Sequence, residues 1–253
     1  MPQSIASPDD KPWTENRILG GQVVLRQPAR GYRVGMDGAL LAAACGTGQR
    51  IFEAGCGVGG ALLATARRQP DAQLVGLERD PEALGLARQN IALNGLEDRV
   101  QALSGDVSQP FRILDLAPFD AVMANPPFFD DPATLRAPAP EKTGAWMADG
   151  GLAAWTGFLL KAVREGGSLT LIHRADRLAD LLALLAPKAG SFQIRPVQPH
   201  ADAPAKRVIL RAIKTGKAPL ALLPPLILHP REGAKHTEET EAILRGEARL
   251  DWL

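Results

Sequence analysis

The sequence predicts an open α/β sheet with helices on both faces, in which seven strands run mostly parallel and the last strand is reversed. From Arg50 onward, short buried runs alternate with amphipathic stretches, a pattern typical of βα units in a parallel sheet. The final two strands are joined only by Pro199 to Pro204, a link too short for a helical crossover, so they are expected to pair antiparallel. A chain of this length buries about three quarters of its unfolded surface, enough for a core with a cleft.

Short apolar runs rich in β-forming residues define the expected strands. They cover residues 51–53, 73–78, 100–104, 119–124, 168–173, 192–196 and 207–213. Amphipathic stretches between them predict helices over 60–68, 81–94, 108–116, 151–164 and 175–186, the third of these on the weakest pattern. The second helix begins with Pro81 in its first turn and ends at Asn94-Gly95, which are typical start and stop residues.

Smaller elements are expected before and after this sheet. Residues 18–26 predict a hairpin that turns at Gly20-Gly21, and residues 36–45 predict a helix capped by Asp37. The apolar run 220–228 is interrupted by Pro224-Pro225, and residues 237–245 predict a terminal helix. The chain is therefore divided into an N-terminal extension (1–49), a main domain (50–217) and a C-terminal extension (218–253).

The composition is that of a globular protein. The chain has 29 basic and 28 acidic residues and is 45% hydrophobic, which excludes a disordered or fibrous chain. Cys45 and Cys56 lack the spacing of a zinc site or a disulfide framework, which favours the reducing cytoplasm. We expect neither a signal peptide nor a membrane span, because no apolar run approaches 18 residues. The sequence leaves monomer and homodimer open.

The charges are unevenly distributed. Residues 1–125 carry a net charge of −2 and residues 126–253 a net charge of +3. Between Lys188 and Lys217 there are seven basic residues and one acid, Asp202. This stretch is either a solvated edge strand protected by its charge or a stripe that faces phosphates.

A glycine-rich loop follows the first parallel strand. Glu53-Ala54-Gly55-Cys56-Gly57-Val58-Gly59-Gly60 allows a tight turn and a close approach of ligand to the start of a helix. Gly55, Gly57 and Gly60 also fit G-x-G-x-x-G, and Glu78 ends the next strand near the spacing of a ribose-binding acid. On these residues alone, a nicotinamide-dependent enzyme stays open.

Three further features point to a different cofactor. Glu53 would repel a pyrophosphate but attract the ammonium of an amino-acid cofactor. Asp106, after the third strand, is placed to accept a proton from an exocyclic amine such as that of adenine. The fourth strand ends in Asn125-Pro126-Pro127-Phe128. Because carboxyl ends of parallel strands meet in one crevice, these residues are expected to share a site.

In this order, these motifs resemble the class I S-adenosylmethionine-dependent methyltransferases of the amino-methylating NPP(Y/F) branch, and imply their Rossmann-like fold. The resemblance implies that S-adenosyl-L-methionine is the cofactor and that the loop of Gly55, Gly57 and Gly59 follows its methionine part. It further implies that Glu78, with Arg79 beside it, holds the ribose hydroxyls, and that Asp106 with the backbone of Val107 reads the adenine amine. Glu53 stands where Asp is more usual but keeps the charge, and Cys56 is expected to fill the loop as a small apolar residue.

The tetrapeptide is identified as the catalytic element. The Asn125 side-chain oxygen and the Pro126 carbonyl can each accept one hydrogen of an exocyclic amine, turning its lone pair toward the methyl group. Pro127 adds rigidity, and Phe128 can stack on the flat group that is methylated. No general base is required, since the proton can leave after the transfer.

Residues 27–43 and 226–229 extend the resemblance to the bacterial tRNA adenine-N6 methyltransferases that act beside the anticodon of a valine tRNA. This resemblance covers about residues 14–247 and implies that Gln27, Tyr32 and Asp37 border the pocket. A core position for Tyr32 and a helix cap for Asp37 stay open beside that role. A tRNA substrate would need basic contacts at the rim of the crevice. The candidates are Arg30, Arg33, Lys206, Arg207, Arg211 and Lys214.

The sequence also leaves room for different acceptors of the methyl group. A protein-glutamine methyltransferase uses the same tetrapeptide on a carboxamide, although only about 50 residues precede the first strand here, which leaves no room for a helical recognition domain. An rRNA or small-molecule amino methyltransferase and a non-catalytic cofactor-binding protein stay open as well. No metal is predicted, because the four histidines are scattered. Trp155 is expected to pack its helix, and the segment from Phe129 to Trp146 is long enough for a lid.

Overall fold

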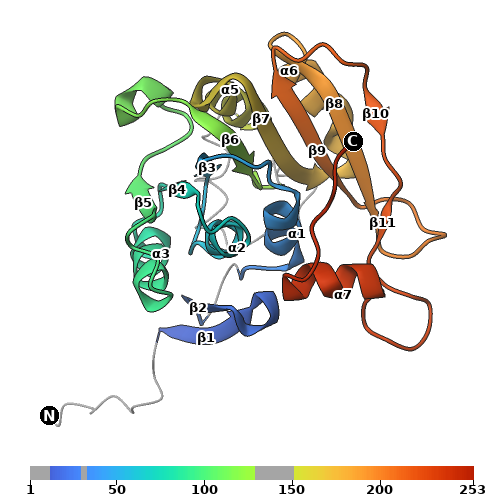
Figure 1. Cartoon of the computed structure of the whole chain (residues 1–253), viewed down its shortest axis with the longest axis horizontal. Helices are drawn as coiled ribbons and strands as arrows, with labels where there is room; N and C mark the ends of the chain where they lie inside the picture. The colour runs from blue at the N-terminus through green and yellow to red at the C-terminus, as the bar shows by residue number, and fades with distance from the viewer. Residues whose placement is uncertain (1–11, 30–32, 129–150) are drawn as a thin grey trace, which may run out of the picture.

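The computed structural model describes residues 12–29, 33–128 and 151–253, and places a nine-stranded sheet at the centre of the molecule (Figure 1). The strand order is β10-β8-β9-β7-β6-β3-β4-β5, with β11 also paired to β8. The central strands are β3 (Arg50–Ala54), β4 (Gln73–Glu78), β5 (Val100–Ser104), β6 (Phe119–Ala124), β7 (Val163–Arg174), β8 (Ala189–Gln198) and β9 (Arg207–Lys214).

The pairing confirms the predicted α/β architecture. Strands β3 to β7 run parallel, and β9 pairs antiparallel with both β7 and β8. The prediction of seven strands missed two short ones, β10 (Ala221–Leu222) and β11 (Leu226–Ile227), which both pair parallel with β8. Pro224-Pro225 separates them, because proline has no N–H to continue a ladder.

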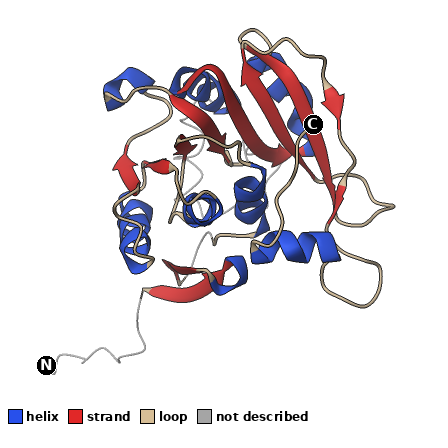
Figure 2. Cartoon of the chain, viewed as in Figure 1, coloured by secondary structure: helices blue, strands red, loops and turns tan. Residues whose placement is uncertain are grey.

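Helices cover both faces of the sheet, as Figure 2 shows. One buried cluster joins the sheet to α1 (Met36–Ala44), α2 (Gly60–Arg68), α3 (Pro81–Leu93) and α7 (Glu238–Arg245). The second cluster lies on the other face and includes α5 (Gly151–Ala162) and α6 (Leu178–Leu185). The helix expected over 108–116 is instead a single 3-10 turn, η2 (Phe111–Leu114), because Pro110 and Pro118 bracket a segment too short for α-helical turns.

The N-terminal hairpin lies apart from the main sheet (Figure 1). Its strands β1 (Trp13–Ile18) and β2 (Val23–Pro28) pair antiparallel, which confirms the predicted hairpin with longer arms. Asn90 of α3 and Asn94, the C-cap residue of that helix, bind β2 as a third strand would. Asn90 exchanges hydrogen bonds with the backbone of Arg26, and Asn94 with that of Val24. These bonds satisfy backbone N–H and C=O groups on the edge of β2 that does not pair with β1. They fix the hairpin over the glycine-loop side of the core.

The C-terminal segment is attached to the same side. Helix α7 follows its cap, Thr237, at the predicted place, and Arg68 of α2 donates to the Ile243 and Ala248 carbonyls at distances of 2.5 and 2.6 Å. Farther on, the Trp252 indole N–H donates to the Ala44 carbonyl at the end of α1. Within the described ranges, no helix combines the length and the apolar character that crossing a bilayer needs.

Candidate functional site

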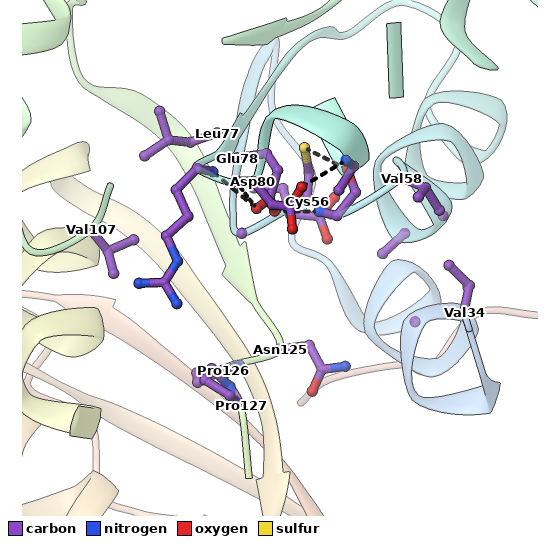
Figure 3. Close-up of a pocket in the computed structure, with 18 of the residues that line it drawn as sticks. Val34, Cys56, Val58, Leu77, Glu78, Asp80, Val107, Asn125, Pro126 and Pro127 are labelled. Carbon is purple, nitrogen blue, oxygen red and sulfur yellow. Dashed lines mark hydrogen bonds between the residues drawn. The ribbon is translucent and has the colours of Figure 1, made fainter. Parts of the chain in front are cut away.

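A cavity of about 650 Å³ opens at the carboxyl ends of the central parallel strands. This volume is within the usual range of small-molecule sites. Figure 3 shows Glu78 above Asn125, with Val107 and Val34 on opposite sides of the space between them. The predicted residues that line the cavity are Glu53, Gly55, Cys56, Gly57, Glu78, Arg79, Val107, Asn125, Pro126, Pro127 and Phe128.

The glycine loop has the backbone that its sequence predicts. Gly55, Gly57 and Gly59 have φ values of +67°, +55° and +89°, in the left-handed region that other residues adopt at a cost. A Cβ atom on Gly55 would lie 2.4 Å from the Trp155 ring, whereas one on Gly57 would meet nothing within 4 Å. Gly55 therefore provides room for Trp155 of α5, and Gly57 leaves its space to the cavity.

Glu53 carries a buried carboxyl group with one oxygen unsatisfied. Only 3% of the residue is exposed, and Oε2 has no hydrogen-bond partner among the described residues. Burial, and then the charge of Glu78, raise the pKa of Glu53 from 4.5 to about 8. A cationic group placed beside it would restore the charged form. This environment fits the ammonium group that the sequence predicts at this position.

Glu78 is held by the backbone around it. Its Oε2 accepts from the Gly57 N–H at 2.8 Å, and its Oε1 accepts from the N–H groups of Arg79 and Asp80 at 2.9 Å. A carboxylate has about four acceptor positions, so capacity remains for a ligand hydroxyl. The same bonds tie the glycine loop to the end of β4 and fix the shape of the cavity.

Asp106 lies next to the cavity without lining it. Its flanking residues Gly105 and Val107 form the wall, while its own carboxylate pairs with Arg79 at 3.6 Å and accepts from the Ser108 N–H at 2.8 Å. Partial burial would raise the pKa of Asp106, but the Ser108 hydrogen bonds and the Arg79 charge lower it below its ordinary value. The carboxylate is thus ionised at neutral pH, as reading an amine requires.

Asn125 lies where β6 ends, at the bottom of the cavity in Figure 3. Its Oδ1 atom is buried and has no hydrogen-bond partner within the described part of the chain. Buried acceptors are normally satisfied, so an oxygen left open at a cavity marks a place for a ligand donor. Pro126 and Pro127 follow in the same wall.

Phe128 is held by residues of two neighbouring strands, β9 and β7. The Arg207 guanidinium carbon lies 4.4 Å from the ring centroid, and the buried His173 ring meets Phe128 edge-on at 5.3 Å. Arg207 Nε also donates to Asp37 Oδ2 at 3.2 Å. The prediction that Asp37 caps α1 is wrong: the cap position is Gly35, and Asp37 instead pairs with β9.

The basic residues predicted at the rim differ in their surroundings. Lys206 is exposed, whereas Arg211 is half-buried with its guanidinium 5.9 Å from the Trp252 ring, and burial lowers its pKa. Lys214 donates to the Val163 carbonyl, and Arg33 donates to Thr14 and Asn16. Arg30, Tyr32 and the proposed lid 129–146 lie outside the described residues.

Sequence reasoning missed several features of the site. Trp155 lines the cavity as well as packing its helix, and Val34 forms a wall because buried Gln27 accepts from its N–H at 2.7 Å.

Three histidines that look scattered in sequence come together in loops: the ring of His229 lies 5.9 Å from that of His200 and 5.1 Å from that of His236. No group of metal-ligating side chains in the described ranges is arranged to hold an ion.

Comparison with known proteins identifies related chains. A family model described as methyltransferase small domain matches residues 38–139. The chain is 32% identical over 217 residues to the tRNA1(Val) (adenine(37)-N6)-methyltransferase of Porphyromonas gingivalis, covering 79% of this chain and 83% of that protein. The release factor glutamine methyltransferase of Moorella thermoacetica is 34% identical over 157 residues, covering 59% of this chain and 54% of that protein.

A solved structure has a similar fold over most of the chain. The crystal structure of a predicted O-methyltransferase from Agrobacterium tumefaciens has a TM-score of 0.69 and 26% sequence identity, covering 85% of this chain and 98% of that one.

Proposed function

The chain belongs to the family of tRNA1(Val) (adenine(37)-N6)-methyltransferases, and from this we propose that it methylates the N6 amine of the adenine next to the anticodon of a valine tRNA. S-adenosyl-L-methionine supplies the methyl group as an electrophilic sulfonium. Since the substrate is a tRNA, we place the enzyme in the cytoplasm.

The open Asn125 oxygen is the observation that carries the reaction type. It is a buried acceptor at the cavity, and the Pro126 carbonyl follows it in a segment that two prolines stiffen. An adenine amine has two hydrogens and a lone pair delocalised into the ring. When both hydrogens are accepted, the nitrogen is oriented with its lone pair toward the methyl group, and the proton leaves after the new N–C bond forms.

The residues present fit the cofactor group by group. Glu53 offers an unpaired carboxylate oxygen to the ammonium, and Glu78 keeps acceptor capacity for the ribose hydroxyls. Val107 lines the cavity and Asp106 lies beside it, and these are the residues proposed to bind the adenine amine. Because Asp106 is also paired with Arg79, cofactor binding would have to share that carboxylate.

For the tRNA backbone we propose contacts at the rim, with Lys206 first because its side chain is exposed. Arg30 and Arg33 would add contacts from the segment before α1. Arg211 and Lys214 are proposals of lower rank, since both are partly buried, whereas Arg33 is exposed even though it donates to Thr14 and Asn16. A net charge of +1 on the chain favours few phosphate contacts.

A glutamine side chain in a protein is the second candidate acceptor, because the Moorella relative carries that name. Its carboxamide would present the same two amine hydrogens to Asn125 and Pro126.

The test is transfer of labelled methyl from S-adenosylmethionine to bulk tRNA from cells that lack this protein, with the nucleosides then resolved by mass spectrometry. We expect N6-methyladenosine, and we expect the Asn125→Ala variant to bind cofactor but transfer no methyl. If the same assay labels a release factor or rRNA but no tRNA, the proposed substrate is wrong. Full activity of Asn125→Ala would overturn the proposed role of the Asn125 oxygen.

A further inference from the structure

Phe128 is the only member of the tetrapeptide whose side chain is fixed by a cation within the described structure. The Arg207 guanidinium carbon lies over the ring at 4.4 Å from its centroid, and the His173 ring packs against Phe128 nearly at right angles, with 5.3 Å between the centroids. Phe128 lines the cavity whereas Arg207 does not. Of the two, Phe128 is therefore the residue that a base in the cavity would meet.

Arg207 is itself fixed from a distant part of the chain. Its Nε donates to Asp37 in the first turn of α1, 170 positions earlier, and its Nη1 donates to the Lys206 carbonyl. Arg207 also opens β9 and pairs in register with Arg174 at the end of β7. A planar guanidinium can stack on a ring and donate in its own plane to a carboxylate at the same time, which an ammonium cannot do.

We propose that the Asp37–Arg207 pair is a clamp that positions Phe128, so that the cavity-side face of its ring is held parallel to the incoming base. Arg207 acts through Phe128 and is a positioning residue; it supports the stacking of the target base without touching the cofactor. This assignment rests on the proposed function, and it replaces the phosphate-binding role that sequence alone gives to Arg207.

A positioning role and a phosphate-binding role for Arg207 predict different kinetics. A positioning residue acts on chemistry, so Arg207→Met lowers kcat by roughly three- to thirty-fold, the scale of a cation–π contact. The KM for tRNA, its salt dependence and the affinity for S-adenosylmethionine stay unchanged. Arg207→Lys, which keeps the charge but not the plane, gives an intermediate kcat, and Asp37→Asn gives a smaller loss than Arg207→Met.

Two controls make the result specific. Arg50 lies 4.7 Å from the Phe119 ring at the opposite end of the sheet, so Arg50→Met removes the same kind of contact without affecting kcat. In a Phe128→Ala background, Arg207→Met causes no further loss of kcat, because the clamp has nothing left to hold.

The experiment measures kcat, KM and salt dependence for these variants, together with the coupling of Phe128 and Arg207 in urea unfolding. A higher KM and a flatter salt slope with unchanged kcat in Arg207→Met would overturn the clamp in favour of phosphate binding. Additive effects on kcat, or no coupling in unfolding, would also overturn it. If the wild type methylates no tRNA, the proposed function fails, while the unfolding cycle still decides whether the clamp exists.

Discussion

Replacing Glu53 with glutamine tests whether its buried carboxyl group destabilises the ligand-free fold and whether its charge attracts the ammonium group of the cofactor. Folding raises the pKa of this carboxyl group from 4.5 to about 8, first through burial and then through the charge of Glu78. Between these two values the folded chain binds the proton more tightly than the unfolded chain. The stability that this group contributes is therefore fully present below pH 4.5, and it is lost as the pH rises toward 8. Glutamine has nearly the same shape and does not titrate.

The size of the effect follows from the displacement of the pKa. Each unit of pKa change corresponds to about 1.36 kcal/mol of unfolding free energy. The change from 4.5 to about 8 therefore represents about 5 kcal/mol. We expect ligand-free Glu53→Gln to be more stable than the wild type by about 2 to 5 kcal/mol at pH 8, and by no more than about 1 kcal/mol at pH 5. The affinity for S-adenosylmethionine changes in the opposite direction, with a loss of about ten-fold or more, because an amide carries no charge to attract an ammonium group.

The assay is urea unfolding of both proteins at pH 5, 6.5 and 8, with calorimetric titration of S-adenosylmethionine at pH 8. Glu97→Gln, on the exposed turn after α3, is the matched control and changes stability by less than about 0.5 kcal/mol at each pH. A stability difference for Glu53→Gln that stays constant from pH 5 to pH 8 would refute the reasoning, since the buried carboxyl would then not titrate as described.

Four other variants test the glycine loop, the attachment of the C-terminal segment and the ribose site. Gly55→Ala should destabilise the fold by about 2 to 4 kcal/mol in urea unfolding, because its Cβ would meet Trp155 at 2.4 Å, while Gly57→Ala should cost only about 1 to 2 kcal/mol; equal losses would contradict this. Arg68→Met should cost about 1 to 3 kcal/mol, since it removes the guanidinium that donates to the Ile243 carbonyl of α7 and to the Ala248 carbonyl beyond it, and a neutral result would show that other donors replace the guanidinium. Glu78→Ala should weaken S-adenosylmethionine binding by about 1 to 3 kcal/mol in calorimetry, and unchanged affinity would remove it from the ribose site.

Much of the sheet was predictable because its signals are local. Strands β4, β5 and β6 and helix α2 have the bounds that the sequence predicts. Each is a short apolar run or an amphipathic stretch between glycine, proline or asparagine, so periodicity and turn residues are sufficient. The motifs after four parallel strands meet at one edge for a topological reason, which is why their convergence could be foreseen.

The sequence by itself determined the architecture, the family resemblance and the order of the cofactor motifs, whereas the tertiary structure alone decided the environments of the side chains. That Asp37 binds Arg207 rather than capping its helix depends on contact between residues 170 positions apart, which no local pattern encodes. The raised pKa of Glu53, the role of Trp155 in the cavity wall and the half-burial of Arg211 depend in the same way on what packs around each group. Burial and pairing are properties of the assembled core, so they appear only when distant segments are brought together.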